Sequence, residues 1–447
     1  MSQEPTGKTA AEAGWHLSRY NLSAKLPGTD KLVIANLFCR TCHAYSPLEV
    51  YLLSVLDELD EHHPILKHFA RRGLIVNFDE AAVLESASRA YSCHPGKVAF
   101  TICPTMACNF DCPYCFEKHR TGRMSPKVQD DIAALAGRML DASGAKRMSV
   151  NWFGGEPLLA PDIIESLSER LMAAAEDRRA DYSTSIITNG YLLTQDIVDM
   201  LARFHVKYMQ ITLDGIGAAH DATRHLTGGG GTFERIMENL GSLSIPFKVT
   251  IRQNVHEGNF DEYEKLCAAV RDLAEKTGNT LYCFPTEVKD NPAAQERRDQ
   301  TELLGKARLS RVGIERDVWE TARRAGGYCF AQSLWGLAID DKGNLYKCEE
   351  IVDKPEQSFG TAAEWDPGNP FQTACRPDQL TAYLNTCGSF HSAECRDCIW
   401  LPVCQGGCPN RRLSGKRVCL SYKDYPEEYV LALYTHLMKD LPTADFK

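Results

Sequence analysis

Three cysteines, Cys108, Cys112 and Cys115, stand within eight residues in the segment CNFDCPYC. Thiolates at this spacing can hold three irons of a [4Fe–4S] cluster and leave the fourth iron without a protein ligand, whereas electron-transfer clusters are closed by four cysteines. An open metal position is a substrate site, as it is in catalytic zinc centres. A zinc knuckle that adds His119 is the alternative interpretation of the same spacing. The segment therefore predicts a metal centre.

A second group of cysteines fills the last third of the chain, where Gly and Pro are frequent and hydrophobic periodicity is weak. Its members are Cys329, Cys348, Cys375, Cys387, Cys395, Cys398, Cys404, Cys408 and Cys419. The 18 cysteines in 447 residues are too few for a disulfide scaffold and many for a reduced cytosolic enzyme, so metal ligation is favoured. Cys39 and Cys42 have CxxC spacing without a second pair nearby, which favours two reduced structural thiols.

The composition excludes several function classes. With 50 Lys and Arg against 59 Asp and Glu, the net charge of −9 gives no electrostatic footprint for nucleic acid or for an anionic membrane. The first twenty residues lack the apolar run of a signal peptide, and no window approaches the ~18 apolar residues of a membrane span. We expect a cytoplasmic protein with a small or peptidic partner.

The elements that position the first cysteines are predicted by alternating short β-rich runs and amphipathic helical stretches. The expected strands cover 99–103, 148–153, 184–188, 207–213, 247–252 and 280–285, and the expected helices cover 126–141, 162–176, 194–204, 232–243 and 259–276. Six such repeats fit a partial (β/α)6 barrel, an α/β fold in which the chemistry gathers at the C-terminal strand ends. The segment CNFDCPYC directly follows the first strand.

Three domains are expected. Residues 1–95 form a small α+β unit with strands near 19–26 and 31–38, residues 96–315 form the barrel, and residues 316–447 form a Cys-rich unit with a closing amphipathic helix.

The CxxxCxxC segment resembles the signature of the radical S-adenosylmethionine (radical SAM) superfamily, in which the open iron binds SAM and its cleavage yields a 5′-deoxyadenosyl radical. Gly154, Gly155, Glu156 and Pro157 resemble the family's GGEP stretch, where glycines permit backbone approach and the Glu region receives the SAM ammonium. The resemblance implies further SAM contacts at Tyr114, Ser185, Thr188, Asn189, Gln210, Asp214, Arg252 and Asn254. We expect Arg252 at the methionine carboxylate of SAM, with a structural ion pair as the alternative.

The array that starts at Cys329 resembles the SPASM domain, which accompanies radical SAM enzymes that modify peptides or proteins and carries two auxiliary clusters. The resemblance therefore implies three [4Fe–4S] clusters in all. Its implied ligand sets are Cys329, Cys348 and Cys408 for one auxiliary cluster, and Cys395, Cys398, Cys404 and Cys419 for the other.

The first auxiliary set departs from the pattern of sulfatase-maturing enzymes, which have another Cys where this chain reads CFAQSLWGL. Its cluster has either a displaced fourth ligand, Cys387 in preference to Cys375, or an open iron. Glu349 stands where those enzymes place an aspartate base, so it could accept a substrate proton. A solvated surface carboxylate is the alternative interpretation.

The N-terminal unit resembles, by its strand pair followed by helices, the winged-helix-like recognition element of maturases of ribosomally made peptides (RiPPs). We expect a radical SAM oxidoreductase that modifies a ribosomal precursor peptide, with a thioether crosslink as the leading product, and a leader segment that adds as a strand to the N-terminal sheet edge. The resemblance implies an electron donor such as flavodoxin or ferredoxin. The alternatives are an anaerobic sulfatase-maturing, formylglycine-forming enzyme, a non-catalytic multi-zinc protein and an electron-transfer protein.

Overall fold

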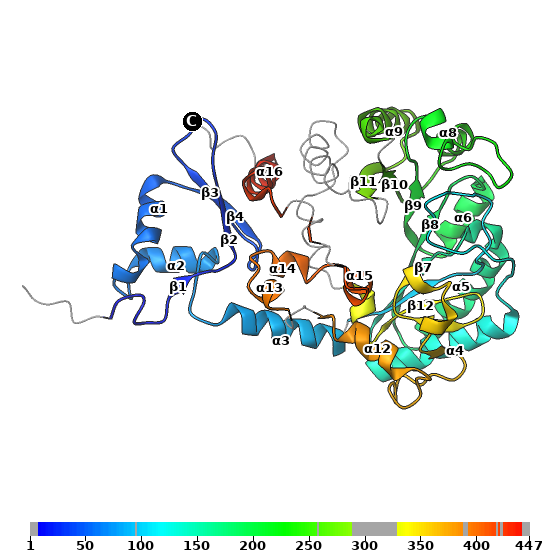
Figure 1. Ribbon diagram of the computed structural model, residues 1–447, viewed down its shortest axis with the longest axis horizontal. Coiled ribbons are helices and arrows are strands. Elements are labelled where there is room, and N and C mark those ends of the chain that lie inside the picture. The colour runs from blue at the N-terminus through cyan, green and yellow to red at the C-terminus, as the bar shows by residue number, and fades with distance from the viewer. Residues whose placement is uncertain are drawn as a thin grey trace, which may run out of the picture.

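The computed structural model describes residues 8–93, 96–256, 259–287, 329–387, 392–416, 419–420 and 423–439. An N-terminal α+β unit lies at one end, a parallel sheet with its helices lies at the other, and C-terminal segments contact both (Figure 1). No helix among these residues is long and apolar enough to cross a bilayer.

Six parallel strands pair in chain order to form the barrel sheet. They are β6 (Val98–Ile102), β7 (Arg147–Trp152), β8 (Asp181–Thr188), β9 (Val206–Thr212), β10 (Lys248–Val255) and β11 (Leu281–Glu287). The helices between them are α4 (Pro126–Ser143), α5 (Pro161–Glu176), α6 (Gln195–Arg203), the short α7 (Ala218–Asp221), α8 (Phe233–Ser242) and α9 (Tyr263–Thr277). The α/β fold with a partial (β/α)6 barrel is confirmed.

The barrel sheet has an apolar face and a polar face because side chains alternate along each strand. Met148, Val150 and Trp152 of β7 are buried in the core under the helices, whereas Asn151 belongs to the other face. The cap of α4 shows how the helices are fixed locally, since the Ser125 hydroxyl accepts a hydrogen bond from the Val128 N–H at 3.3 Å. The apolar face holds the barrel together, and the polar face is left for chemistry.

The barrel sheet continues into the C-terminal region. Strand β12 (Gly336–Ile339) pairs parallel to β6, and β13 (Asn344–Tyr346) and β14 (Gly360–Thr361) add antiparallel strands beyond it. The domain boundary expected between 315 and 316 lies outside the described residues. The first part of the cysteine-rich region therefore extends the barrel sheet.

The N-terminal unit contains a three-stranded antiparallel sheet of β2 (Asn21–Lys25), β3 (Leu32–Asn36) and β4 (Thr41–Tyr45). Its other elements are β1 (His16–Leu17), β5 (Ile75–Val76), α1 (Pro47–Ser54), α2 (Pro64–Arg71) and α3 (Glu80–Cys93). Cys42 of β4 is buried, and burial raises its pKa to about 12. Cys39 packs over Gly73, where an added Cβ would meet its Sγ at 2.5 Å.

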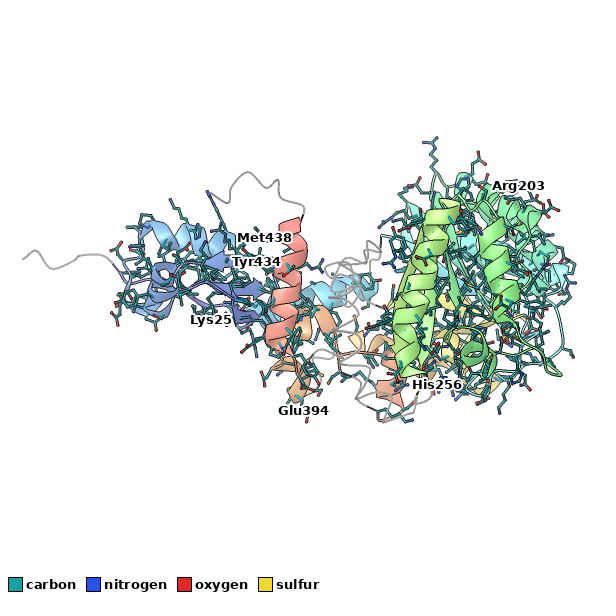
Figure 2. The ribbon with its side chains drawn as sticks, turned by 90° about the horizontal axis from the view of Figure 1, so that it is seen from above. Lys25, Arg203, His256, Glu394, Tyr434 and Met438 are labelled. Atoms are coloured by element: carbon teal, nitrogen blue, oxygen red, sulfur yellow. The ribbon has the colours of Figure 1, made fainter. Side chains whose placement is uncertain are left out.

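Both faces of this small sheet are covered. On one face, Ile34 and Tyr45 pack with Phe69 of α2. On the other face, Val33 lies in one hydrophobic core with residues of α14 (Leu401–Cys404) and α16 (Pro426–Lys439). Figure 2 shows α16, with Tyr434 and Met438 labelled, beside the N-terminal unit and apart from the barrel. The C-terminal segments thus connect the two ends of the molecule.

The remaining helices of the cysteine-rich region are short. They are α12 (Pro377–Leu384), α13 (Ala393–Arg396) and α15 (Pro409–Leu413).

Candidate active site

Cys108, Cys112 and Cys115 lie on the loop that leaves the carboxyl end of β6. The Phe110 N–H donates to Cys108 Sγ at 3.4 Å, and the Cys115 N–H donates to the Cys112 carbonyl at 3.0 Å. Burial raises the pKa of Cys108 to about 12 and that of Cys115 to about 11. These thiols are protonated at neutral pH without a metal, so metal binding must release their protons.

The loop from His225 to Gly231 holds the cysteine loop in place. The Asp111 N–H donates to the His225 carbonyl at 3.1 Å, and the Thr227 N–H donates to the Asn109 carbonyl at 2.9 Å. The turn of this loop is formed by three glycines with φ values that favour glycine: 89° at Gly228, 96° at Gly229 and 113° at Gly230.

The GGEP stretch packs directly on the cysteine loop. A Cβ on Gly154 would lie 2.3 Å from the Thr105 carbonyl oxygen, and a Cβ on Gly155 would lie 2.3 Å from the Ala107 carbonyl oxygen. The Glu156 N–H donates to the same Ala107 oxygen at 2.8 Å. Only glycine permits this approach between the two loops.

The Glu156 carboxylate is buried and accepts three hydrogen bonds. The donors are the Leu158 N–H at 2.9 Å, the Thr188 hydroxyl at 2.6 Å and the Asn189 N–H at 2.7 Å. Burial raises the pKa of Glu156, although these hydrogen bonds favour its charged form. The side chain therefore ties the loop after β7 to the end of β8, while Pro157 is buried beside it in a short 3-10 turn.

Polar side chains lie along the interior face of the barrel. Ser185 of β8 donates to Asn151 Oδ1 at 2.9 Å, and Asn189 Nδ2 donates to Asn109 Oδ1 on the cysteine loop at 2.7 Å. Gln210 pairs in register with Ile187 and Thr250, and its neighbours Met209 and Ile211 face the opposite, apolar side. Ser185 and Gln210 thus share the polar face, whereas Thr188 pairs in register with Ile211 and donates instead to Glu156.

Asp214 is the centre of a buried network at the end of β9. Its carboxylate accepts hydrogen bonds from the Tyr114 hydroxyl, from the Thr223 hydroxyl at 3.1 Å and from the Asn254 N–H at 3.1 Å. Arg252 Nε donates to Asn254 Oδ1 at 2.9 Å, and no carboxylate in the described part of the chain pairs with Arg252. Burial lowers the pKa of Arg252. Four of the expected site residues, Tyr114, Asp214, Arg252 and Asn254, therefore come from three separate parts of the chain to one place.

Arg224 belongs to this network and was not singled out from the sequence. Its Nη1 donates to the Tyr114 hydroxyl at 3.0 Å, while its buried Nε has no hydrogen-bond partner. Burial lowers its pKa, but Tyr114, Cys112 and Asp214 outweigh burial and hold that pKa above the usual range. A buried guanidinium with a spare donor suits a carboxylate ligand.

His220 is a second buried residue that sequence patterns did not indicate. Burial and the Arg224 charge lower its pKa to about 3, so the ring is neutral. The Asp214 N–H donates to Nδ1 at 3.1 Å, and Nε2 therefore carries the proton toward Thr232 Oγ1 at 3.0 Å. The only sequence signal for Arg224 and His220 is their place on the loop after a barrel strand, where functional side chains gather.

The first auxiliary set lies within electrostatic reach of Tyr383 of α12. Burial raises the pKa of Tyr383, and negative charge on Cys348, Cys408 or Cys329 raises this pKa further. Cys387 has other neighbours, because its Sγ donates to the Ser88 carbonyl of α3 at 3.1 Å. Burial first, and then the charge of Cys93, raise the pKa of Cys387. Cys375 is exposed.

Glu349 follows Cys348 and is half-buried. Its negative charge is among the causes that raise the pKa of Cys329 and of Glu117, and it favours the charged form of Arg252. Burial first, and then the charge of Asp353, raise the pKa of Glu117 to about 8. Glu349 therefore lies within electrostatic reach of both the barrel interior and the first auxiliary set.

The second auxiliary set, Cys395, Cys398, Cys404 and Cys419, lines one small cavity together with Trp400, Leu401, Gly406, Arg412, Leu420 and Lys423. Burial, and then the charges of the other three cysteines, raise the pKa of Cys404 to about 11. Four thiols around one cavity are the donor set of a closed iron–sulfur cluster.

Single-ion metal sites have a different geometry. Among the described residues, no three His, Cys, Asp or Glu side chains converge as the ligands of one metal ion do. The Cys115 Sγ and His119 Nε2 lie 3.5 Å apart, which is the contact expected of the zinc alternative. Cluster ligands each bind a different iron. The cysteine loop, its glycine contacts and the spare donor of Arg224 fit a cluster with a bound carboxylate-bearing cofactor.

Comparison with known sequences decides the family of the barrel. Residues 102–269 match the radical SAM superfamily. The chain carries a radical SAM domain. This domain begins at the last residue of β6 and includes the cysteine loop, the GGEP stretch and the Asp214 network.

The relatives of the radical SAM chain include two maturation enzymes. It is similar to the serine-type anaerobic sulfatase-maturating enzyme of Klebsiella aerogenes, with 24% identity over 69% of this chain and 80% of that protein. It is also similar to the mycofactocin maturase MftC of Mycolicibacterium smegmatis, with 27% identity over 68% of this chain and 76% of that protein. Native anSMEcpe with bound AdoMet and Cp18Cys peptide shares the fold, with a TM-score of 0.57, 18% identity and coverage of 77% of this chain and 98% of that one.

Proposed function

We propose that this radical SAM chain is a maturase that modifies a ribosomally made precursor peptide. The observation that carries the proposal is the meeting of the cysteine loop, the GGEP stretch and the buried Tyr114, Asp214 and Arg224 network at the C-terminal ends of the barrel strands. The similarity to enzymes named as maturases supports the peptide or protein substrate class.

Bound SAM and its cluster supply a 5′-deoxyadenosyl radical that abstracts a hydrogen atom from the substrate. The chain's own part is to bind and orient. Cys108, Cys112 and Cys115 would hold the cluster, and the buried guanidinium of Arg224, with Arg252 nearby, would bind the SAM carboxylate. The polar side chains of the barrel interior, which include Ser185 and Gln210, would meet the ribose. An external one-electron donor such as flavodoxin or ferredoxin is part of the proposal.

The precursor leader would bind at the open edge of β4. Within the described part of the chain this strand pairs only with β3, and its sequence TCHAY contains no Lys, Asp, Glu or Pro to block the addition of another strand. The opposite edge strand, β2, ends in Lys25 and is contacted along its length by α16. Helix α1 begins two residues after β4 and exposes Leu48 and Tyr51 by 66% and 62%, so apolar surface is available beside the β4 edge.

The proposed product is a thioether. The thiols of Cys329, Cys348 and Cys408 lie within electrostatic reach of Tyr383, whereas the Cys387 thiol donates a hydrogen bond to α3. The first three cysteines therefore suit a cluster with one iron open to a substrate thiolate. The substrate thiol would lose a proton, and a substrate carbon would lose a hydrogen atom to the radical that SAM supplies. The cluster, which Cys329, Cys348 and Cys408 would hold, would take up the one electron released when the S–C bond forms. Glu349, which lies within electrostatic reach of Cys329, would take the thiol proton.

A sulfatase-maturing function is supported equally by the comparisons, because the Klebsiella aerogenes relative and the anSMEcpe structure point to it. Such an enzyme would oxidise a protein Cys or Ser to formylglycine. The N-terminal unit with its open β4 edge favours the precursor peptide, because modification of a sulfatase segment would not require such a binding unit.

The experiment incubates the anaerobically reconstituted protein with SAM, a reductant and either a precursor peptide encoded beside its gene or a sulfatase segment. High-resolution mass spectrometry after iodoacetamide treatment should show a precursor product that has lost one hydrogen pair and one alkylation site. A product that has lost the hydrogen pair but still alkylates at every cysteine would exclude the thioether. Formylglycine in the sulfatase segment, with the precursor untouched, would replace the proposed function by the alternative.

A further inference from the structure

Two cations line the cavity of Cys395, Cys398, Cys404 and Cys419. They are Arg412, near the end of α15, and Lys423, which follows the last of the four cysteines. Neither side chain forms an ion pair with a carboxylate within the part of the chain that the structure describes. Among the described residues, no carboxylate therefore neutralises the two positive charges at the cysteine cavity.

Arg412 contacts one of the thiols directly. Its Nη1 donates to Cys395 Sγ at 3.2 Å, and the same nitrogen donates to the Gly406 carbonyl oxygen at 2.9 Å. The second contact fixes the guanidinium on the segment that also bears Cys404, so the side chain bridges two parts of the cavity wall. An exposed arginine without these anchors would spread its charge over many rotamers.

We propose that Arg412 is a positioning residue that raises the reduction potential of the cluster held by these four cysteines, with Lys423 as a second, weaker contributor. This inference rests on the proposed function, a maturase with auxiliary clusters, one of which the four thiols of this cavity would hold. Four thiolates give such a site net negative charge, and one-electron reduction adds one more negative charge. Hydrogen bonds and cations at the sulfurs stabilise the more negative state, so they favour reduction.

The consequence concerns the electron that a substrate radical must lose when its product forms. The first auxiliary cluster would take up that electron when the S–C bond forms, and a second site that favours its reduced state would then accept it from the first cluster. Arg412 would then set the direction of electron flow from the substrate toward this cavity, which adjoins the N-terminal unit through the core shared with Trp400.

The test measures the midpoint potential of this site alone in the full-length protein. Cys112→Ala and Cys348→Ala together remove the other two clusters, so about four irons should remain per chain. In this background, Arg412→Gln should lower the ratio of reduced to oxidised cluster about tenfold at a fixed potential, or about 59 mV for one electron. Arg412→Lys should restore part of the loss. Electron paramagnetic resonance during a redox titration reads both values.

The matched control is Arg396→Gln, because Arg396 follows Cys395 directly but is exposed and does not line the cavity. It should leave the potential unchanged. Equal shifts in Arg396→Gln and Arg412→Gln would overturn the inference, as would an unchanged potential in Arg412→Gln with four irons retained. If Arg412→Gln loses iron, Lys423→Gln must shift the potential in the same direction. A background protein without iron would instead overturn the cluster assignment in the proposed function.

Discussion

At the residue scale, Gly155 allows the close approach of the GGEP stretch to the cysteine loop. Because a Cβ there would lie 2.3 Å from a backbone oxygen of Ala107, Gly155→Ala must push the two loops apart. A shift of about 1 Å in a reacting group can cost about a hundredfold in rate. We therefore expect 5′-deoxyadenosine formation by reduced Gly155→Ala to fall about a hundredfold, as measured by liquid chromatography with mass detection.

Gly241→Ala is the control for this substitution. Gly241 lies in α8, and its added Cβ would meet only the flexible end of the Leu273 side chain at 3.3 Å. This variant should keep its activity. Equal losses in both glycine variants would show that the contact between the two loops has no special role.

The sequence predicted those site residues whose type alone indicates a chemical role, such as a metal-binding thiol. The thiols, the double glycine and Glu156 were expected from the sequence, and the structure places them against one another. Arg224 was missed because an arginine on a loop is usually solvated, and its role depends on burial against Tyr114 that local sequence does not encode. The three hydrogen bonds that Glu156 accepts from other parts of the chain were likewise beyond prediction.

At the scale of elements, hydrophobic periodicity placed the six barrel strands to within a few residues, because each repeat buries an apolar face under its own helix. Strand β4 was not expected. Its sequence TCHAY has weak apolar alternation, and its position is decided by pairing with β3 and by packing of Tyr45 on α2. Short strands that depend on tertiary contacts give little local signal.

The edge of β4 and the exposed side of α1 carry an element-scale prediction about peptide binding. Leu48→Lys with Tyr51→Lys should weaken the affinity of the precursor peptide about tenfold or more, since this removes about 1.4 kcal/mol of apolar contact. Both side chains are largely exposed, so the fold should be unaffected. Fluorescence anisotropy with a labelled precursor gives the affinities.

Phe371→Lys provides the matched control, because Phe371 is 43% exposed and belongs neither to the N-terminal unit nor to a barrel strand. It should bind the precursor as the wild type does. Unchanged affinity in the α1 double variant would show that the leader binds elsewhere.

At the scale of the whole molecule, the N-terminal unit and the second auxiliary cysteine segment are parts of one core. Trp400 is buried there beside Tyr429, with ring centroids 5.1 Å apart, and Arg19 pairs with Asp397 at 3.1 Å. Residues nearly four hundred positions apart in the chain thus depend on each other, which is why composition and periodicity could divide the chain but could not show how its parts join.

This shared core predicts the effect of removing a single large side chain. Trp400→Ala should cost about 3–5 kcal/mol of local stability. Hydrogen exchange should then speed up in β2 and β3 of the N-terminal sheet, while protection in the barrel strands β7 and β8 stays as it was. Uniform loss of protection across the barrel would contradict this arrangement, and unchanged exchange in β2 and β3 would show that the N-terminal sheet is stable without α14.

The central claim is that the three cysteines after β6 hold a cluster that cleaves SAM, and that two further clusters lie in the C-terminal region. Its most direct test measures iron and 5′-deoxyadenosine together in the anaerobically reconstituted wild type and in Cys112→Ala. The wild type should bind about twelve irons per chain and form deoxyadenosine, whereas Cys112→Ala should keep about eight irons and form none. Deoxyadenosine production by Cys112→Ala at the wild-type rate, or zinc in place of iron in the wild type, would contradict the account.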